Sequence, residues 1–394
     1  MPMNSDMYRT IKADAFPQRI SVSFHYDDKE EVTHYEKVLF DGQGLRYGDN
    51  PDQSAAWYRK ISPKGAVETS QNLPFPIQVG KHPSKTNISD IYSAVRVLTY
   101  IPNDPTVIIV KHGNPCGAAI ADTIDNAFEC AHDADRIAAF GGVIVSNREV
   151  SKKFAMRVTQ HFFEVLAAPR FTSQALEILG KKKSLSVFQT PPMSTSNMEC
   201  RMLLDGSLLM QTTFEPVRLQ RKSIKTARTE YQGKEYCIKQ QPSEEHIRDM
   251  RFGWILQSAV MSNAIVFIKD QKSIAIAAGA QDRVGAVKNA VNKAYRNAME
   301  YRAHMEFEKS FDQLPNERQM YIRELVHSDN AGLRGSVMIS DGFFPFPDAV
   351  QMALKEGVQA ILQPGGSIRD YASIIACNEG SASMVFTGQR GFLH

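Results

Sequence analysis

The sequence predicts an α/β fold, because strand–turn–helix units recur in both halves of the chain. In the N-terminal half, the β-branched run at residues 107–110 is typical of a buried strand. In the C-terminal half, apolar strands at residues 337–339, 358–362 and 383–387 alternate with turns and helix-like stretches. This alternation indicates sheets flanked by helices.

The other expected elements follow in chain order. Residues 20–24 alternate apolar and polar side chains, as an edge strand does, and residues 88–101 form a helix with an apolar stripe of Ile91, Val95 and Leu98. Further strands are expected at residues 138–145, at 165–169, at 264–268 and at 273–278. Further helices are expected at residues 173–179, at 244–262, at 349–356 and, as a charged excursion broken at Leu314-Pro315, at 284–327. The Ser-, Thr-, Pro- and Met-rich stretch at residues 184–200 connects two subdomains, residues 1–195 and 196–394.

Residues 106–122, TVIIVKHGNPCGAAIAD, form the stretch around which the chain is organised. The strand stops at Lys111-His112, a turn is expected at residues 113–117, and a helix-like run follows over residues 118–132. An amine and an imidazole therefore lie at the C-terminal end of a strand, the edge at which open α/β sheets bind ligands. A Lys-His pair at a strand end more often marks only the point where the chain re-enters water, so this stretch alone favours that interpretation over catalysis.

The composition is that of an ordinary globular protein, with 43% hydrophobic and 23% charged residues in a chain of 394. The formal net charge of +3 is too small to indicate a nucleic-acid partner. The five cysteines are scattered and form no CxxC pair, which favours a reducing compartment over a disulfide framework. No apolar run reaches membrane length and the N-terminus shows no signal-peptide pattern, so we expect a soluble cytoplasmic protein without a membrane partner.

Three loops carry candidate ligand-binding residues. Arg46 and Tyr47 lie on a turn-rich loop, and the planar fork of an arginine suits phosphate, although the loop taken alone is more typical of an ordinary surface turn. The cluster Lys181-Lys182-Lys183 could hold a phosphate by charge attraction, or it could be a solvated helix end. The segment GFFPFPD at residues 342–348 places rigid aromatic rings beside Asp348, which suits a flat heterocycle, although a hydrophobic plug between helix and sheet would have the same pattern.

Motifs in fixed order resemble the AICAR transformylase domain of the bifunctional PurH family over residues 40–394: LRYGDNPDQ, KHGNPCG, AAFGGVIVSNR, SNAIV, SDGFFPFPD, ILQPGGSIRD and TGQRGFLH. The resemblance implies two cytidine-deaminase-like α/β subdomains with mixed sheets flanked by helices, and a homodimer with shared active sites. PurH-type proteins usually carry an N-terminal IMP cyclohydrolase domain, whereas only about forty residues precede the RYG motif here. The chain is therefore similar to a stand-alone transformylase.

The reaction implied by this resemblance is transfer of a formyl group from 10-formyltetrahydrofolate to the 5-amino group of AICAR, in purine (IMP) biosynthesis. That amine is a weak nucleophile, so a base must take its proton during the attack. The resemblance places His112 in this role, and the adjacent Lys111 cation should help to keep the imidazole neutral. Lys111 would also serve the oxyanion or the leaving nitrogen of the folate, and Asn263 would donate to the formyl oxygen.

The same motifs imply which residues bind the substrates. Those for AICAR are Arg46, Tyr47, Asn87, Lys182, Lys183, Arg283, Arg390 and Phe392, with one lysine of the 181–183 run on the phosphate. Those for the folate are Phe343, Phe346 and Asp348. A monovalent cation such as potassium near Ser262, Asp341 and His394 is a further implication, and no zinc is expected.

Some positions depart from the family pattern, and they surround the expected substrate contacts without including Lys111-His112. Asp52 occupies the position of the His in RYGxNPHQ, Ala138 that of the Ser before AFGG, and Met261 that of the Lys before SNA. Ala280, Gln281 and Asp282 replace the three middle residues of GQMSR, and Gly391 replaces the His of RHF. These changes indicate a divergent subfamily or an altered affinity for the nucleotide.

Two other functions are alternatives to the transformylase. A zinc deaminase needs a His-x-Glu or Cys-x-Glu motif followed by PCxxC. His34-Tyr35-Glu36 and His304-Met305-Glu306 have no PCxxC downstream, and the residue three after Cys116 is Ala119, which argues against this class. A non-catalytic purine-nucleotide binding protein derived from the family would bind AICAR without turnover, and the retained Lys111-His112 pair argues against it.

Overall fold

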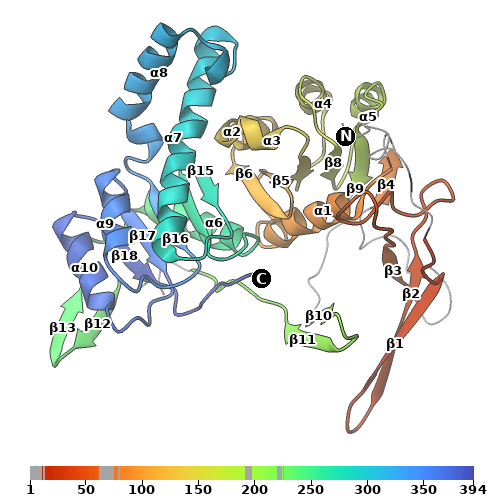
Figure 1. Ribbon diagram of the computed structural model, residues 1–394, viewed down its shortest axis with the longest axis horizontal. Helices are drawn as coiled ribbons and strands as arrows, with labels where there is room; N and C mark the ends of the chain where they lie inside the picture. The colour runs from red at the N-terminus through yellow and green to blue at the C-terminus, as the bar shows by residue number, and fades with distance from the viewer. Residues whose placement is uncertain are drawn as a thin grey trace. The chain divides into compact units, whose positions relative to one another are not determined.

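The computed structural model describes residues 11, 14–61, 75–78, 80, 82–190, 198–219, 224 and 226–394. The chain forms two compact units, residues 1–95 with 141–194 and residues 96–140 with 195–394 (Figure 1). The predicted boundary at residues 195/196 lies outside the described residues. Residues 96–140, which the sequence analysis placed in the first subdomain, belong to the second compact unit. The assignment of residues 1–195 and 196–394 to two transformylase subdomains stays a prediction.

A mixed sheet forms the centre of the second unit, as predicted. Its strands are, in spatial order, β18 (Ser383–Phe386), β17 (Ala360–Gln363), β16 (Val337–Ser340), β14 (Ile265–Lys269), β15 (Lys272–Ala277), β6 (Asn114–Ile120) and β5 (Thr106–Lys111). The first three are parallel, and each of the other neighbouring pairs is antiparallel. β16 and β17 are buried along their whole length, as expected for strands covered on both faces.

Helices cover both faces of this sheet. They are α6 (Glu244–Gln257), α7 (Arg283–Phe307), α9 (Asp348–Lys355) and α10 (Asp370–Glu379). Because side chains alternate along a strand, Phe267 and Met338 join the core on the side of α7 and α9, while Ile268 and Ile339 lie against α6. Gly253 of α6 permits this packing, since a Cβ there would lie 2.4 Å from Cδ1 of Ile339.

The Lys-His segment is the tip of a β-hairpin, and the predicted turn at residues 113–117 and helix over residues 118–132 are wrong at this point. β5 pairs with β6 in antiparallel register, with Lys111 opposite Asn114. Pro115 lies in β6 next to a register shift, which is where a strand tolerates the missing N–H of proline. The helical part begins later, in α2 (Ile124–Ala134), and Gly117 lets it pack on β6, because a Cβ at Gly117 would lie 1.9 Å from the Ala131 carbonyl oxygen.

A short helix replaces the first part of the predicted strand at residues 138–145. α3 (Arg136–Ala139) is capped by Asp135, whose Oδ1 accepts from the backbone N–H of Ala138 at 2.9 Å. Gly141 then takes a positive φ of 73°, so the strand proper begins only at β7 (Val143–Ser146). The local N-cap bond therefore decides the conformation of a segment whose apolar composition alone favoured a strand.

The charged excursion predicted over residues 284–327 is helical and interrupted, as expected. It consists of α7, a single 3₁₀ turn at Phe311–Gln313, and α8 (Asn316–Ser328), which packs along α7 (Figure 1). The break ends at Pro315, the N-cap residue that precedes α8. Two exposed β-hairpins complete the unit: β10 (Met198–Met202) with β11 (Leu208–Thr212), and β12 (Arg228–Tyr231) with β13 (Lys234–Cys237).

The first unit contains the parallel strands β7, β8 (Val165–Ala168) and β9 (Ser186–Gln189), and β4 (Phe75–Gln78), which is antiparallel to β9. Its helices are α1 (Lys85–Leu98), α4 (Lys152–Thr159) and α5 (Ser173–Leu179). A separate antiparallel sheet contains β1 (Arg19–His25), β2 (Glu30–Lys37) and β3 (Tyr58–Ile61). The predicted edge strand, the VLAA strand and the helix at residues 173–179 are confirmed. Among the described residues of both units, no helix has the length and apolar character that a membrane crossing would need.

Candidate active site

The tip of the β5–β6 hairpin presents Lys111 and His112 side by side. His112 has φ 55° and Gly113 has φ 78°, the two positive values that a tight two-residue hairpin turn of type I′ requires. The Lys111 Nζ donates to the carbonyl oxygen of Phe140 at 2.7 Å, and the His112 side chain is exposed. The local turn thus fixes the backbone of both residues while their polar groups stay at the surface.

A cavity of about 380 Å³ lies against this hairpin, a volume typical of small-molecule sites. The residues that line it come from β5, β6, α3, β15 and α7: Lys111, His112, Asn114, Pro115, Cys116, Ala138, Ile276, Ala277, Ala278, Asn289 and Lys293. Asn289 and Lys293 were missed by the sequence analysis, which treated their helix as an external excursion. Their spacing of four residues places both on one helix face, and this is the only sequence signal that could have suggested them.

Cys116 lies in the wall of this cavity as a neutral thiol. Burial raises its pKa to about 12, and the nearby Asp135 carboxylate acts in the same direction. The Sγ atom donates to the carbonyl of Ile109 at 3.5 Å. Since the thiolate is the nucleophilic form, Cys116 contributes shape and not nucleophilic chemistry near neutral pH.

Asn114 ties the hairpin to the segment that contains Asn263. Its Oδ1 accepts from the backbone N–H of Met261 at 3.0 Å. Two residues later, the Asn263 side-chain amide donates to the carbonyl of Ala280 at 2.9 Å, and its Oδ1 accepts from Nη2 of Arg283 at 2.8 Å. An amide group has two N–H donors, so the one without a partner among the described residues is available to a substrate oxygen. The hydrogen bond between Met261 and Asn114 therefore links the segment that contains Asn263 to the hairpin that carries Lys111 and His112.

A buried ion pair lies beneath Asn263. Arg283 pairs with Asp341, and their side chains are 7% and 0% exposed. The second oxygen of Asp341 accepts from Oγ of Ser262 at 2.6 Å, and that hydroxyl accepts in turn from the backbone N–H of Leu393 at 3.1 Å. Both carboxylate oxygens of Asp341 therefore have donors within the protein, and the predicted monovalent cation near Ser262, Asp341 and His394 stays a prediction.

The C-terminal segment packs over this ion pair. A Cβ at Gly342 would lie 2.5 Å from Nη2 of Arg283 and 2.8 Å from the Phe392 ring, so Phe392 and Arg283 are neighbours. The guanidinium of Arg390 lies 4.6 Å from the centre of the Phe392 ring. The His394 ring packs edge-on against Phe392, with the ring centres 5.6 Å apart. Arg283, Arg390 and Phe392, predicted for AICAR, thus form one cluster.

The GFFPFPD loop divides its aromatic residues between two roles. Phe344 is fully buried and anchors the loop in the core, whereas Phe343 and Phe346 are 42% and 49% exposed. Asp348 is exposed at the start of α9, and the Arg369 guanidinium lies 4.8 Å from the centre of the Phe346 ring. The hydrophobic-plug interpretation therefore applies to Phe344 alone, and the three residues predicted to bind folate are accessible.

The remaining predicted residues lie in the first unit. Arg46 is only 1% exposed; its Nη2 donates to the Tyr47 hydroxyl at 3.1 Å, whereas Nε and Nη1 have no hydrogen-bond partner among the described residues. The backbone carbonyl of Tyr47 accepts from the N–H of Lys85, which places this loop beside the start of α1. Asn87 of α1 donates to Oε2 of Glu164 at 3.0 Å. A buried guanidinium with free donors is suited to an anion.

Glu164 is a further residue that the sequence analysis missed. The sequence signal that could have suggested it is its position just before the buried β8 strand. The Nζ atom of Lys182 donates to the carbonyl oxygen of His161 at 3.3 Å, and Lys183 is exposed. The phosphate role of these lysines stays a prediction. Within the described part of the chain, no three His, Cys, Asp or Glu side chains are grouped as metal ligands would be.

Comparison with known proteins identifies the family of this chain. Residues 8–293 match the model of the AICARFT/IMPCHase bienzyme family. The chain is 36% identical to the bifunctional purine biosynthesis protein PurH of Oceanobacillus iheyensis, over 94% of this chain and 62% of that protein. It is 35% identical to the PurH proteins of Magnetococcus marinus and of Thermoanaerobacter sp., over 96% and 91% of this chain and 62% and 60% of those proteins. The chain thus spans less than two thirds of the length of these relatives. The match of the family model to most of the chain shows that this protein belongs to the AICARFT/IMPCHase bienzyme family.

Proposed function

We propose that this protein acts in purine biosynthesis by transferring the formyl group of 10-formyltetrahydrofolate to the 5-amino group of AICAR, giving formyl-AICAR and tetrahydrofolate. The observation that carries this proposal is the hairpin tip that presents Lys111 and His112 at a cavity of about 380 Å³. A base and an ammonium held on a rigid strand end suit a proton-coupled acyl transfer better than a passive binding site. The family match and the PurH relatives support the same assignment.

The chemistry requires one bond to form and one to break. The amino nitrogen of AICAR attacks the formyl carbon, and His112 takes a proton from that nitrogen as the C–N bond forms. The tetrahedral intermediate carries a negative oxygen, which the free amide N–H of Asn263 and the Lys111 ammonium would stabilise. The bond from the formyl carbon to N10 then breaks, and N10 receives a proton from Lys111 or from the protonated His112. Protons balance because the one taken from AICAR replaces the one delivered to the folate.

Arg283 would position Asn263 in this scheme. Its Nη2 holds the Asn263 carbonyl oxygen, which turns the N–H groups of the amide toward Ala280 and the site. Asp341 holds Arg283 in turn, so the orientation of the oxyanion donor rests on a buried ion pair. The buried guanidinium of Arg46 is a candidate for the AICAR phosphate, together with Tyr47, Lys182, Lys183 and Arg390, and Asn87, Arg283 and Phe392 would help to hold the nucleotide. Phe343, Phe346 and Asp348 would hold the folate, in a homodimer with shared sites.

Tetrahydrofolate formation from AICAR and 10-formyltetrahydrofolate, followed by absorbance with the purified chain, tests the proposal. Turnover that requires both substrates is expected. If AICAR binds by calorimetry but no tetrahydrofolate forms, the formyl-transfer assignment is overturned.

A further inference from the structure

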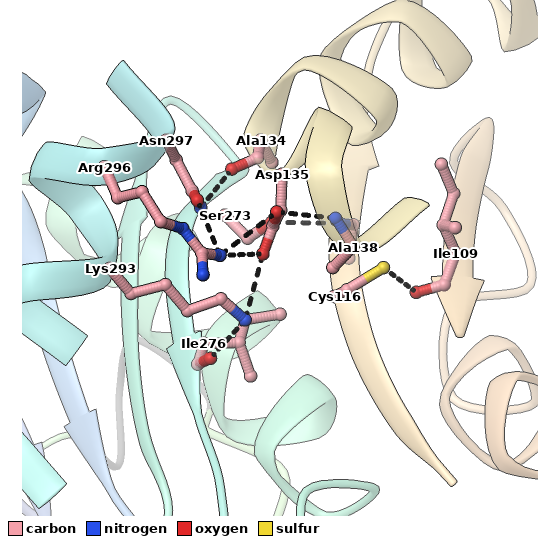
Figure 2. A network of polar contacts seen from close by, with 11 residues as sticks. Ile109, Cys116, Ala134, Asp135, Ala138, Ser273, Ile276, Lys293, Arg296 and Asn297 are labelled. Atoms are coloured by element: carbon pink, nitrogen blue, oxygen red, sulfur yellow. Dashed lines mark hydrogen bonds and ion pairs between the residues drawn. The ribbon is translucent and has the colours of Figure 1, made fainter. Parts of the chain in front are cut away.

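Lys293 of α7 places a second ammonium group on the wall of the cavity that holds Lys111 and His112. Its Nζ lies 3.0 Å from Oδ2 of Asp135 and donates to the carbonyl of Ile276 at 3.0 Å (Figure 2). The Lys293 side chain is 24% exposed, so it is held inward and is not a free surface lysine. An ammonium has three donors, and these two contacts leave one for a ligand in the cavity.

The charge of Asp135 does not cancel that of Lys293, because the carboxylate is shared with a second cation. Nη2 of Arg296 lies 3.4 Å from Oδ2 and 3.5 Å from Oδ1 of the fully buried Asp135 carboxylate (Figure 2). Oδ1 also accepts from the N–H of Ala138. One carboxylate thus faces two cations, and the group carries a net positive charge.

Among the described residues that line the cavity, none is acidic, so no lining carboxylate offsets this charge. Lys111 and Lys293 are its two ammonium groups, Asn114 and Asn289 are neutral amides, and the remaining lining residues apart from His112 are apolar or, like Cys116, neutral. The Lys111 ammonium donates to the neutral carbonyl of Phe140, so no described ion pair neutralises it. A partly enclosed space with two ammonium groups and no carboxylate favours an anion, because the low local dielectric strengthens each attraction.

We propose that this cavity binds an anionic oxygen group of a substrate and that Lys293 is the positioning residue that fixes it. The inference deepens the proposed formyl transfer, which supplies two sources of such a group: the glutamate carboxylates of the folate and the phosphate of the nucleotide. Lys293 touches that group and not the reacting formyl carbon. Its role is to set the depth at which one substrate lies against Lys111 and His112.

The network offers matched variants. Lys293→Met removes the ammonium but keeps the length and apolar stem of the side chain, and Arg296 remains to pair with Asp135. Arg296→Met removes the other cation of the same carboxylate, at a side chain that is 51% exposed and does not line the cavity. Lys293→Arg keeps the charge. If Lys293 has only a structural role, Lys293→Met should lower the affinity for all ligands alike. If Lys293 binds an anion, Lys293→Met should lower the affinity only for the charged member of a matched pair.

Calorimetric titration of the full chain with two ligand pairs tests the inference. The folate pair is p-aminobenzoylglutamate and its uncharged diamide; the nucleotide pair is AICAR and its dephosphorylated riboside. Loss of one charge-assisted hydrogen bond should weaken the charged ligand of one pair by about ten- to hundredfold in Lys293→Met. The neutral ligand of that pair should bind as before, and Lys293→Arg and Arg296→Met should keep the preference of the wild type for the charged form.

Loss of the preference in the folate pair identifies the glutamate carboxylate as the anion, and loss in the nucleotide pair identifies the phosphate. The inference is overturned if Lys293→Met keeps the wild-type preference in both pairs, or if it weakens charged and neutral ligands equally. If Lys293→Met fails to fold, Lys293→Gln is titrated instead, with the same two outcomes. These measurements need no turnover, so their failure is distinct from an absence of formyl transfer in the wild-type protein.

Discussion

The Nη2 atom of Arg283 lies 2.8 Å from Oδ1 of Asn263, and the same guanidinium pairs with the buried carboxylate of Asp341. Asn263 and Arg283 are twenty residues apart in the sequence, whereas Asp341 lies in another strand–turn–helix unit. The orientation of the proposed oxyanion donor is therefore set by a charge that comes from the C-terminal third of the chain.

Replacing Arg283 by Ala should destabilise the protein, because it leaves the fully buried Asp341 carboxylate without its cation. Removal of one partner of a buried ion pair costs about 3–5 kcal/mol. The free energy of unfolding from urea denaturation measures this effect. Arg302→Ala is the matched control: its pair with Asp329 is exposed on both sides, at 43% and 46%, and should contribute less than about 1 kcal/mol. Equal effects of the two variants would contradict the structural role assigned to Arg283.

Replacing His112 should abolish turnover while AICAR still binds, because the lost contribution is proton transfer, worth about 10²- to 10⁴-fold. His112 occupies a left-handed turn position with φ 55°, which Asn adopts readily and Ala does not. His112→Asn therefore keeps the hairpin, and His112→Ala tests the added cost of backbone strain. Steady-state kcat and calorimetric AICAR binding are the measurements. A kcat close to the wild-type value in His112→Asn would remove His112 from the mechanism.

Cys116 should resist alkylation in the folded protein. With a pKa of about 12, its thiolate fraction at pH 8 is about one part in ten thousand, and only the thiolate reacts. Cys200 and Cys237 are exposed and serve as internal controls in the same sample. Iodoacetamide labelling at pH 8, read by peptide mass spectrometry, should modify the two controls first. Labelling of Cys116 at the same rate as Cys200 would show that the cavity wall is not formed as described.

Ionisation of the Asp370 carboxyl should lower the free energy of unfolding as the pH rises. Burial raises the pKa of this carboxyl, although the backbone N–H groups of Gly366 and Ser367 oppose the shift. A raised pKa means that the folded state binds the proton more tightly than the unfolded state does, so stability is lost as pH increases from about 4 through the raised pKa.

Asp370→Asn cannot ionise and removes this dependence. The difference in unfolding free energy between the wild type and Asp370→Asn, measured in urea from pH 4 to pH 7, should therefore fall with increasing pH. A difference that rises with pH, or that stays constant, would contradict the assignment.

The sequence by itself determined the α/β class, the buried strands, and most helices, because these depend on local hydrophobic periodicity and on turn residues. It also identified the candidate site residues through the family resemblance. It did not determine the hairpin at Lys111-His112, since Asn-Pro and an alanine-rich run favour a turn and a helix locally. Pairing with β5 and β15, and the close approach of α2 to Gly117, decide that this segment is a strand.

Only the tertiary structure decided which distant residues share a site. Asp135, Lys293 and Arg296 lie in two helical regions that carry no motif, and their charges meet because α7 packs against the start of α3 (Figure 2). In the same way, Arg283 reaches Asp341 because β14 and β16 are neighbours in the sheet. Periodicity is a local property of the chain, whereas a buried charge acquires its partner only when the sheet order is set.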